Sequence, residues 1–290
     1  MKPRRVVLGL IQSSPAQDPV RNLARALRLA RRAAEKGAQI ICLPELYRSL
    51  YFPQSPRARA GHLTEEIPGE STESFSRLAR ELGAVMIIPL FERERSKNRF
   101  YNSAAVLDAD GKLLGTYRKA HIPHDPLFYE RGYFEPGQGG FKVFRTRHAA
   151  FSVLICYDQW FPEAARACAL AGAEILFYPT AIGYVRGERA PEGDWREAWT
   201  TVQRGHAIAN SVHVAAVNRV GTEGRLRFWG SSFVADAFGN VLRRAGSSRE
   251  EVLVASVDLS QNRRVGESWG FLRNRRPDNY GALVAPVRPP

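Results

Sequence analysis

The segment from Ala149 to Gly183 reads AAFSVLICYDQWFPEAARACALAGAEILFYPTAIG, and its pattern predicts the fold class. It begins with a short apolar run, Phe151 to Ile155, which is typical of a buried strand. Pro162 then stands where the first residue of a helix is expected, and the helix is predicted to run to Gly172. A second apolar run, Ile175 to Tyr178, predicts another buried strand. The segment therefore predicts a strand–helix–strand unit of an α/β fold.

Cys156 lies at the turn between the first of these strands and the helix. In this position a thiol is lifted clear of the sheet, and the amides and dipole of the helix favour its thiolate. The backbone N–H of Tyr157 is expected to be free to bind a developing oxyanion. A small, buried and inert cysteine is the alternative, and this segment alone leaves both interpretations open.

The composition is that of an ordinary globular protein with an excess of positive charge. The chain has 290 residues, of which 44% are hydrophobic and 24% charged, and its net charge is +13. All but six of its 42 basic residues are arginine, and they are scattered rather than gathered in an aromatic–basic or zinc-finger motif. We interpret the charge as compositional bias, so that no specific nucleic-acid partner is expected and a nucleic-acid-binding protein is the less favoured class.

The cysteines and the hydropathy indicate the compartment. Cys42, Cys156 and Cys168 are an odd number and widely spaced, which argues against a disulfide framework and predicts the reducing cytoplasm. No apolar run is long enough to cross a bilayer, so no membrane partner is expected.

Strand–helix–strand units alternate with hairpins in the rest of the chain, so the sheets are predicted to be mixed. Further strands are predicted over residues 6–11, 39–43, 84–91, 101–107, 112–118, 212–217, 231–235, 241–244 and 252–259, and further helices over residues 18–36, 71–82 and 195–210. No linker divides the chain, so a single domain over residues 1–290 is predicted. Its tail, residues 261–290, has little periodicity and is expected to dock on a surface or a partner.

Two charged residues stand at the ends of other predicted strands. Glu45 ends the apolar run that begins at Ile40, and a carboxylate there is costly unless it faces polar partners or a cleft. Lys119 ends a hairpin strand in a chain whose usual cation is arginine, which indicates a need for a compact point charge. A salt bridge at the sheet edge and an ordinary surface lysine are the alternatives. A pair of Cys156 with His121 also remains open, because an activated thiol needs a base nearby.

Three blocks of sequence resemble the signature blocks of the nitrilase superfamily of carbon–nitrogen hydrolases. They are LPEL at 43–46, YRKAHIP at 117–123 and ICYDQWFPE at 155–163. Four further segments are similar to the branch that hydrolyses N-carbamoylputrescine, namely FYPTAIG at 177–183, NRVG at 218–221, GSSF at 230–233 and RRPD at 275–278. The similarity extends over nearly the whole chain.

The resemblance implies an α-β-β-α sandwich with two mixed β-sheets, in which Glu45, Lys119 and Cys156 meet at one end of the sheets. It also implies a homodimer or a larger homo-oligomer, in which the sandwiches stack and residues 261–290 pack at the interface.

The resemblance also implies roles for individual residues. Glu45 would act as general base, and Lys119 would hold the oxyanion together with the amide of Tyr157. Glu130 corresponds to a second glutamate that the family places beside the lysine and the thiol. The alternative for Glu130 is a loop carboxylate paired with Arg131.

The activity that the resemblance implies is hydrolysis of the C–N bond of an N-carbamoyl amine through a covalent thiol-linked intermediate, with release of amine, CO2 and ammonia. No metal or organic cofactor is implied, and the spacing of His121 and His124, interrupted by Pro123, does not fit a zinc motif. An ω-amidase, an aliphatic amidase and an N-carbamoyl amino acid hydrolase are the alternatives within the superfamily, and a nitrile hydrolase is less favoured. The intact Glu, Lys and Cys blocks argue against a family member that serves only as a scaffold.

The substrate pocket is expected to be rich in aromatic residues from the loops that follow the strands. The candidates are Tyr47, Tyr51, Phe52, His124, Tyr129, Trp160, Thr180, Ala181, Ile182 and Tyr184. In the N-carbamoylputrescine branch, a glutamate suited to the ammonium group usually follows the segment equivalent to 177–183. Val185 stands there in this chain and Glu188 comes only later, so recognition of an ammonium group stays open.

Overall fold

The computed structural model describes residues 3–188 and 191–286. Its first six-stranded sheet consists of β1 (Arg5–Gln12), β2 (Ile40–Cys42), β3 (Val85–Glu94), β4 (Arg99–Leu107), β5 (Leu113–Arg118) and β15 (Glu251–Asp258). The order across this sheet is β15–β1–β2–β3–β4–β5, with β1, β2 and β3 parallel and the other pairs antiparallel.

The second six-stranded sheet consists of β6 (Phe144–Arg145), β7 (Ala150–Val153), β8 (Ile175–Thr180), β10 (His213–Asn218), β13 (Phe233–Ala235) and β14 (Val241–Arg244). Its order is β14–β13–β10–β8–β7–β6, and the central strands β10, β8 and β7 are parallel. The predicted pair of mixed sheets is therefore confirmed.

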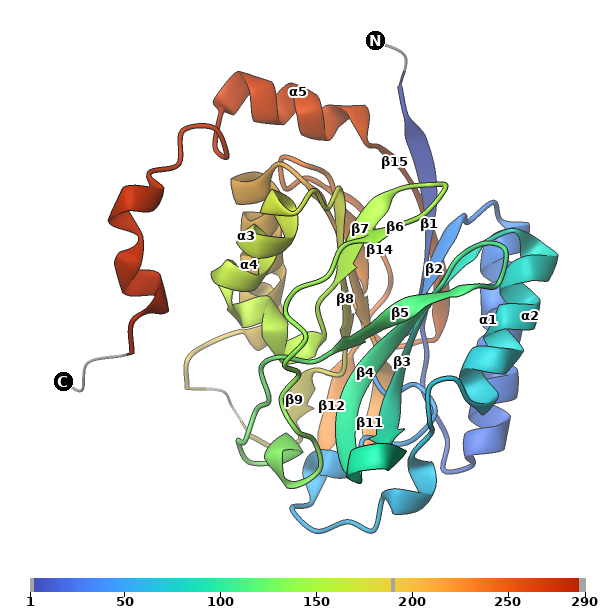
Figure 1. Cartoon of the computed structure of the whole chain (residues 1–290). Coiled ribbons are helices and arrows are strands. Elements are labelled where there is room, and N and C mark those ends of the chain that lie inside the picture. Colours follow the sequence, from blue (N-terminus) through green and yellow to red (C-terminus); the bar gives the residue numbers. More distant parts are fainter. Residues whose placement is uncertain (1–2, 189–190, 287–290) are drawn as a thin grey trace.

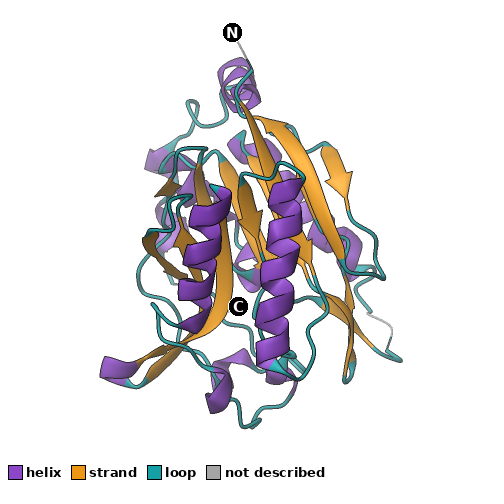
Figure 2. Ribbon diagram, turned by 90° about the vertical axis from the view of Figure 1, so that its right-hand side faces the viewer, coloured by secondary structure: helices purple, strands orange, loops and turns teal. Residues whose placement is uncertain are grey.

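Helices cover the outer face of each sheet (Figures 1 and 2). The first sheet is covered by α1 (Pro19–Glu35) and α2 (Glu70–Leu82), and the second by α3 (Pro162–Leu170) and α4 (Trp195–Asn210). The inner faces of the sheets pack on each other, with β1 against β10. Leu8 and Leu10 of β1 and Phe177 of β8 are fully buried in this shared core. Each such side chain contributes roughly 1.5–3 kcal/mol when it is buried.

Local signals account for the start, the stop and the packing of α1. The Asp18 side chain accepts hydrogen bonds from the backbone N–H groups of Val20 and Arg21 and so caps the first turn. Gly37, with φ 89°, ends the helix in a conformation that favours glycine. The helix also lies very close to β1, because a Cβ on Gly9 would come within 3.0 Å of the Cβ of Ala33 in the helix.

A third, three-stranded antiparallel sheet was not expected from the sequence. It consists of β9 (Gly183–Val185), β11 (Val220–Glu223) and β12 (Leu226–Trp229), in the order β11–β12–β9. These strands have only three or four residues each, which is too short for an alternating pattern to be recognised. The sheet lies beside the end of the sandwich where β8 ends (Figure 1).

The tail after residue 261 shows little periodicity in the sequence, yet its first part is helical. Ser260–Trp269 forms the helix α5, whose N-terminus is held by hydrogen bonds from Ser260 N and Arg264 Nη2 to the Asp258 carboxylate. The chain from 270 to 286, which we call the C-terminal arm, then extends away from the sandwich (Figure 1).

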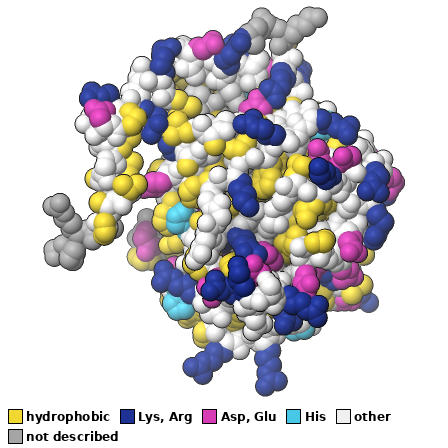
Figure 3. Space-filling model, viewed as in Figure 1, with side chains coloured by type: hydrophobic (Ala, Val, Ile, Leu, Met, Phe, Trp, Pro, Cys, Tyr) yellow, Lys and Arg dark blue, Asp and Glu magenta, His cyan; other side chains and the backbone are white. Residues whose placement is uncertain are grey.

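Charged side chains are spread over the surface rather than concentrated. Figure 3 shows lysine and arginine scattered over one face among acidic and apolar side chains. None of the helices described has the length and hydropathy of a membrane span.

Candidate active site

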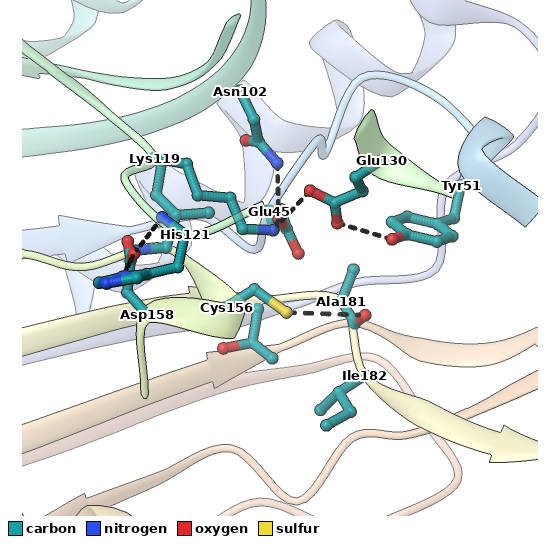
Figure 4. A network of polar contacts seen from close by, with 12 residues as sticks. Glu45, Tyr51, Asn102, Lys119, His121, Glu130, Cys156, Asp158, Ala181 and Ile182 are labelled. Carbon is teal, nitrogen blue, oxygen red and sulfur yellow. Dashed lines mark hydrogen bonds and ion pairs between the residues drawn. The ribbon is translucent and has the colours of Figure 1, made fainter. Parts of the chain in front are cut away.

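Three strand ends bring Glu45, Lys119 and Cys156 together (Figure 4). Glu45 follows β2, Lys119 directly follows β5, and Cys156 follows β7. Lys119 Nζ lies 2.8 Å from Glu45 Oε1 and 2.6 Å from Glu130 Oε2, so the ammonium group bridges two carboxylates. All three of these charged side chains are fully buried.

Two neutral side chains also donate hydrogen bonds to the carboxylates. Asn102 Nδ2 donates to Glu45 Oε1 at 2.7 Å, and Tyr51 Oη donates to Glu130 Oε1 at 2.7 Å. Glu45 Oε2 is buried and has no hydrogen-bond partner among the described residues. A buried carboxylate oxygen without a partner is costly and is available to accept a proton.

The turn at Cys156 has an unusual backbone conformation. Cys156 has φ 44°, in the left-handed region that non-glycine residues seldom adopt, and it begins a 3₁₀ turn, Cys156–Trp160. Its sulfur lies 3.9 Å from the backbone oxygen of Ala181. Among the described residues, no group accepts a hydrogen bond from the N–H of Tyr157, which leaves this donor beside the sulfur-bearing residue available to a ligand.

The charges of the cluster depend on one another. Burial, reinforced by Glu45 and opposed by Lys119, raises the pKa of the Cys156 thiol well above its usual value, so the resting sulfur keeps its proton. Burial opposes the charge of Lys119, but Glu130 and Glu45 outweigh it and raise the pKa of the ammonium group. Burial also raises the pKa of Glu130, against the attraction of Lys119. The thiolate that the sequence suggests is therefore not the resting form, because α3 begins only at Pro162 and the sulfur is buried among carboxylates.

A cavity of about 490 Å³ opens onto this cluster. Cys156 and Glu130 line its buried end, and exposed residues line its open end. The lining residues also include Pro123, Asp125, Pro126, Phe128, Tyr157, Trp160, Ile182, Val185, Glu188, Glu192, Trp195 and Ala198. The cluster thus combines a buried nucleophile, an available proton acceptor, a fixed cation and a free backbone N–H at the end of a pocket, which is an arrangement suited to acyl transfer.

The sequence matches the carbon–nitrogen hydrolase family over residues 7–266. The chain belongs to this family. The predicted resemblance is therefore confirmed, and the protein is a carbon–nitrogen hydrolase similar to the N-carbamoylputrescine amidases.

Individual relatives of the hydrolase cover almost its whole length. An N-carbamoylputrescine amidase from Solanum lycopersicum is 45% identical over 293 residues, which cover 98% of this chain and 96% of the relative. A citrullinase from Francisella tularensis is 39% identical and covers 96% of this chain, with 98% of its own length matched.

Solved structures agree with the fold. A carbon–nitrogen hydrolase from Helicobacter pylori G27 superimposes with a TM-score of 0.92 at 39% identity, covering 98% of this chain and 99% of its own. A glutamate-to-glutamine mutant of an amidase from Nesterenkonia sp. AN1 is 26% identical, with a TM-score of 0.79 and coverage of 96% of this chain and 97% of its own. It carries the acetamide moiety of fluoroacetamide on its active-site cysteine.

The hydrolase lines its cavity differently from the sequence expectation. Of the expected residues, Trp160 and Ile182 line the cavity. Tyr51 and Ala181 lie just behind it, since they contact Glu130 and Cys156. The expected segments around residues 123–130, 156–160 and 182–185 contribute to the lining, whereas the segment 47–52 does not and the segment 188–198 was not expected.

The other expected pocket residues do not line this cavity. Tyr47 packs on Phe75 under α2, and Phe52 stacks on Phe91, because both complete apolar clusters. The Thr180 hydroxyl donates to the backbone oxygen of Tyr178. His124 and Tyr129 pack on each other within one loop, and the Tyr184 hydroxyl on β9 donates to Asp194 at the start of α4; none of the three lines the cavity.

Two alternatives for the cluster are also resolved by the geometry. His121 Nδ1 lies 2.7 Å from Asp158 Oδ1 and its ring stacks on Phe161, so it does not pair with Cys156. Glu130 bonds to Lys119 and Tyr51, whereas the Nε of Arg131 donates to the backbone oxygen of Ile122.

Sequence reasoning missed the acidic rim of the cavity, Asp125, Glu188 and Glu192. Each of these residues lies in a long loop without periodicity. The only nearby signals in the sequence that could have indicated a role at the cavity are a proline-rich turn and the start of α4. Among the described residues, no group of three or more His, Cys, Asp or Glu side chains is placed to hold a metal ion.

Proposed function

We propose that this hydrolase cleaves an N-carbamoyl amine whose far end carries an ammonium group, as in N-carbamoylputrescine. The observation that carries the proposal is the charge of the cavity, which has the thiol of Cys156 at its buried end and Asp125, Glu188 and Glu192 at its open end. Glu188 is already paired with Arg225, which leaves recognition of the ammonium group to Asp125 and Glu192. These two residues would supply the acidic partner for the ammonium group, which the apolar Val185 cannot supply.

In the first half of the proposed reaction, the sulfur attacks the carbonyl carbon as its proton passes to Glu45 Oε2. Lys119 Nζ and the N–H of Tyr157 hold the oxyanion, and one such donor is worth about 3 kcal/mol in the transition state. The tetrahedral intermediate then collapses, and the leaving nitrogen takes the proton from Glu45. Glu130 keeps Lys119 in place and lies at the cavity wall beside the substrate.

In the second half, Glu45 removes a proton from water, which attacks the thioester carbon and frees the sulfur. The released carbamate or carbamic acid loses CO2 and leaves the second nitrogen compound. One water is consumed, and one amine, one CO2 and one ammonia are formed. Each step uses only groups that converge in Figure 4 or the N–H of Tyr157.

The main alternatives differ in charge. A monoamide of a dicarboxylic acid brings a carboxylate toward the acidic rim, where like charges repel. A ureido amino acid such as citrulline brings a carboxylate and an ammonium group on the same carbon, so its far end has no net charge and is attracted less than that of N-carbamoylputrescine. Because one relative is named a citrullinase, a ureido amino acid is the second candidate for the substrate.

The test compares N-carbamoylputrescine, citrulline, succinamate and an aliphatic nitrile, with release of ammonia as the readout. We expect kcat/KM to be highest for N-carbamoylputrescine, by at least about tenfold. Cys156→Ala abolishes turnover, whereas Cys168→Ala, a buried thiol on α3, serves as the matched control and retains it. Higher kcat/KM for the carboxylate-bearing substrates would contradict the proposed specificity, and turnover by Cys156→Ala would contradict the mechanism.

The rim residues have their own test. Glu192→Gln and Asp125→Asn are expected to raise KM for N-carbamoylputrescine but not for n-butylurea, which has the same stem without the charge. Glu267→Gln, an exposed carboxylate on α5, is the control. Equal effects on both substrates would show that the rim does not recognise the ammonium group.

We also propose that two copies of the hydrolase associate through the C-terminal arm and the end of α5. Large apolar side chains are exposed there, with Trp269 56%, Leu283 63% and Val284 90% accessible. Such a surface favours a protein partner, and a second copy presents the same surface. Leu283→Asp with Val284→Asp is expected to halve the mass measured by light scattering, and Val20→Asp, an exposed valine on α1, leaves it unchanged. A wild-type protein of monomer mass would refute this assembly.

We retain the cytoplasm as the proposed location, because the cysteines of the chain are unpaired in the structure and a thiol nucleophile must stay reduced.

A further inference from the structure

A buried ion pair lies outside the catalytic cluster and takes no part in the proposed chemistry. Arg219 Nη1 and Glu223 Oε2 are 3.3 Å apart at the two ends of a short stretch that includes β11. Their side chains are 0% and 2% exposed. Burying two charges is costly, so a pair in this position needs further partners to offset the loss of water.

The further partners are backbone groups of one segment. Arg219 Nη2 donates to the backbone oxygens of Leu46 at 3.2 Å and Ser49 at 2.7 Å. Glu223 Oε2 accepts a hydrogen bond from Tyr51 N at 2.6 Å. One ion pair on the small third sheet therefore fixes both ends of the segment 46–51, which belongs to the first half of the chain.

This segment connects two members of the cluster. Its first residue, Leu46, directly follows Glu45 and has φ 49°, a conformation that costs a non-glycine residue about 1–2 kcal/mol and needs external support. Its last residue, Tyr51, donates through its hydroxyl to Glu130 Oε1. The two carboxylates that hold Lys119 are thus both anchored to the segment that Arg219 and Glu223 clamp.

We propose that Arg219 and Glu223 are positioning residues that set the placement of Glu45 and Glu130 around Lys119 and Cys156. The inference rests on the proposed function, because kcat is measured with the proposed substrate. It also goes beyond the proposed function, because neither residue touches the substrate cavity. Loss of the clamp displaces Glu45 relative to the sulfur, and a displacement of about 1 Å at a reacting group can lower the rate about 100-fold.

A purely structural role and a positioning role can be separated by experiment. Removing one member of a buried ion pair leaves an uncompensated charge and destabilises strongly, whereas replacing both members with apolar residues is often neutral. We therefore compare Arg219→Met, Glu223→Leu and the double variant by urea unfolding and by kinetics at a temperature where all are folded. We expect the double variant to be more stable than either single variant while its kcat stays at least about 30-fold below wild type.

Several controls sharpen the comparison. Arg219→Lys keeps the charge but cannot bond two carbonyls in a fixed fork, so we expect it to recover stability more than kcat. Arg4→Met with Glu174→Leu removes another Arg–Glu pair, whose carboxylate likewise accepts a backbone N–H, from Ala150. That pair lies away from the cavity, and its loss is expected to leave kcat within about twofold of wild type.

A second readout does not depend on the identity of the substrate. Alkylation of Cys156 by iodoacetamide requires a base that takes the thiol proton, so its rate reports on the placement of Glu45. We expect the double variant to be alkylated at least about tenfold more slowly than wild type. If wild type cleaves no carbamoyl compound, the proposed function fails while this rate still tests the clamp. A stable double variant with wild-type kcat and wild-type alkylation would overturn the inference.

Discussion

At the scale of single residues, one buried carboxylate holds the turn that carries the thiol. Asp158 accepts hydrogen bonds from Ile155 N at 2.9 Å, Tyr117 Oη at 2.7 Å and His121 N at 3.0 Å, and it also contacts the His121 ring. A strained conformation such as that of Cys156 costs of order 1–3 kcal/mol and persists only where its surroundings fix it. His121 therefore serves the backbone of the turn rather than the sulfur.

The first prediction concerns Asp158→Asn. The amide places an N–H₂ group opposite a donor, so at least one hydrogen bond is replaced by a repulsive contact. We therefore expect kcat to fall about 100-fold and the free energy of unfolding to fall by about 1–3 kcal/mol. Initial-rate kinetics and urea titration measure the two effects. Asp236→Asn, which also removes a carboxylate bonded to turn amides, is the control for kcat. A kcat within twofold of wild type for Asp158→Asn would show that the turn keeps its shape without the carboxylate.

The second prediction concerns pH. Because burial raises the pKa of Glu130, this carboxylate takes up a proton at a higher pH than an ordinary glutamate, for which the pKa is about 4.3. Glu130 holds Lys119 only when ionised, so activity is present above this raised pKa and is lost as the pH falls through it. The profile of kcat/KM against pH checks this, and Glu130→Gln is expected to lower the plateau and remove that acid limb. An acid limb that persists unchanged in Glu130→Gln would assign it to another group.

At the scale of elements, α4 connects the cavity rim to the thiol turn. Its first turn is capped by Asp194, whose carboxylate accepts from Arg196 N, Glu197 N and the Tyr184 hydroxyl. Further along, Trp199 Nε1 donates to the side-chain oxygen of Gln159 at 2.8 Å, inside the 3₁₀ turn of Cys156. The middle of α4 thus supports the turn that carries Cys156, and the start of α4 supports the rim of the cavity.

The third prediction separates these two functions of α4. Asp194→Ala is expected to cost about 1 kcal/mol of stability and to loosen the first turn, which carries Trp195 to the rim. We therefore expect KM to rise severalfold with kcat almost unchanged. Asp18→Ala removes the same kind of cap from α1, far from the cavity, and should cost similar stability with no change in KM. Equal kinetics for the two variants would mean that the start of α4 does not shape the rim.

The elements that could be predicted are those with strong local signals. For α1, Asp18-Pro19 at the start, Gly37 at the end and an apolar face between them fix the helix within the sequence. The third sheet and α5 could not be predicted in this way. β9 pairs with β12 more than forty residues along the chain, and α5 is polar, with Ser260 its only buried residue. Their structure depends on tertiary contacts that no local pattern records.

The same distinction applies to the candidate site. Glu45, Lys119 and Cys156 could be proposed because each follows a strand within three residues and lies in a recognisable block. The cavity lining could not, because it draws on loops around residues 123–130, 156–160, 182–188 and 192–198, and side-chain direction within those loops is set by packing. Tyr47, which points under α2 instead of into the cavity, is the clearest instance.

At the scale of the whole molecule, the two large sheets share one core, and the fourth prediction tests whether they unfold as one domain. Leu10→Ala, in β1 of the first sheet, is expected to cost about 2–5 kcal/mol. All the tryptophans, at 160, 195, 199, 229 and 269, lie outside the first sheet. If the molecule is a single cooperative unit, the transition seen by tryptophan fluorescence in urea moves with the transition seen by circular dichroism. A fluorescence transition that Leu10→Ala leaves in place would indicate two units, and Val20→Ala is the exposed control.

The small third sheet has a consequence for protein engineering. It contributes Val185 to the rim, yet Arg219 and Glu223 anchor the loop behind Glu45 from the same sheet. On the proposals above, selectivity and turnover are mechanically coupled through this one small sheet. A chimaera that imports the sheet from a relative in order to change the accepted amine must retain both buried charges, or it will gain the new preference at the expense of its rate.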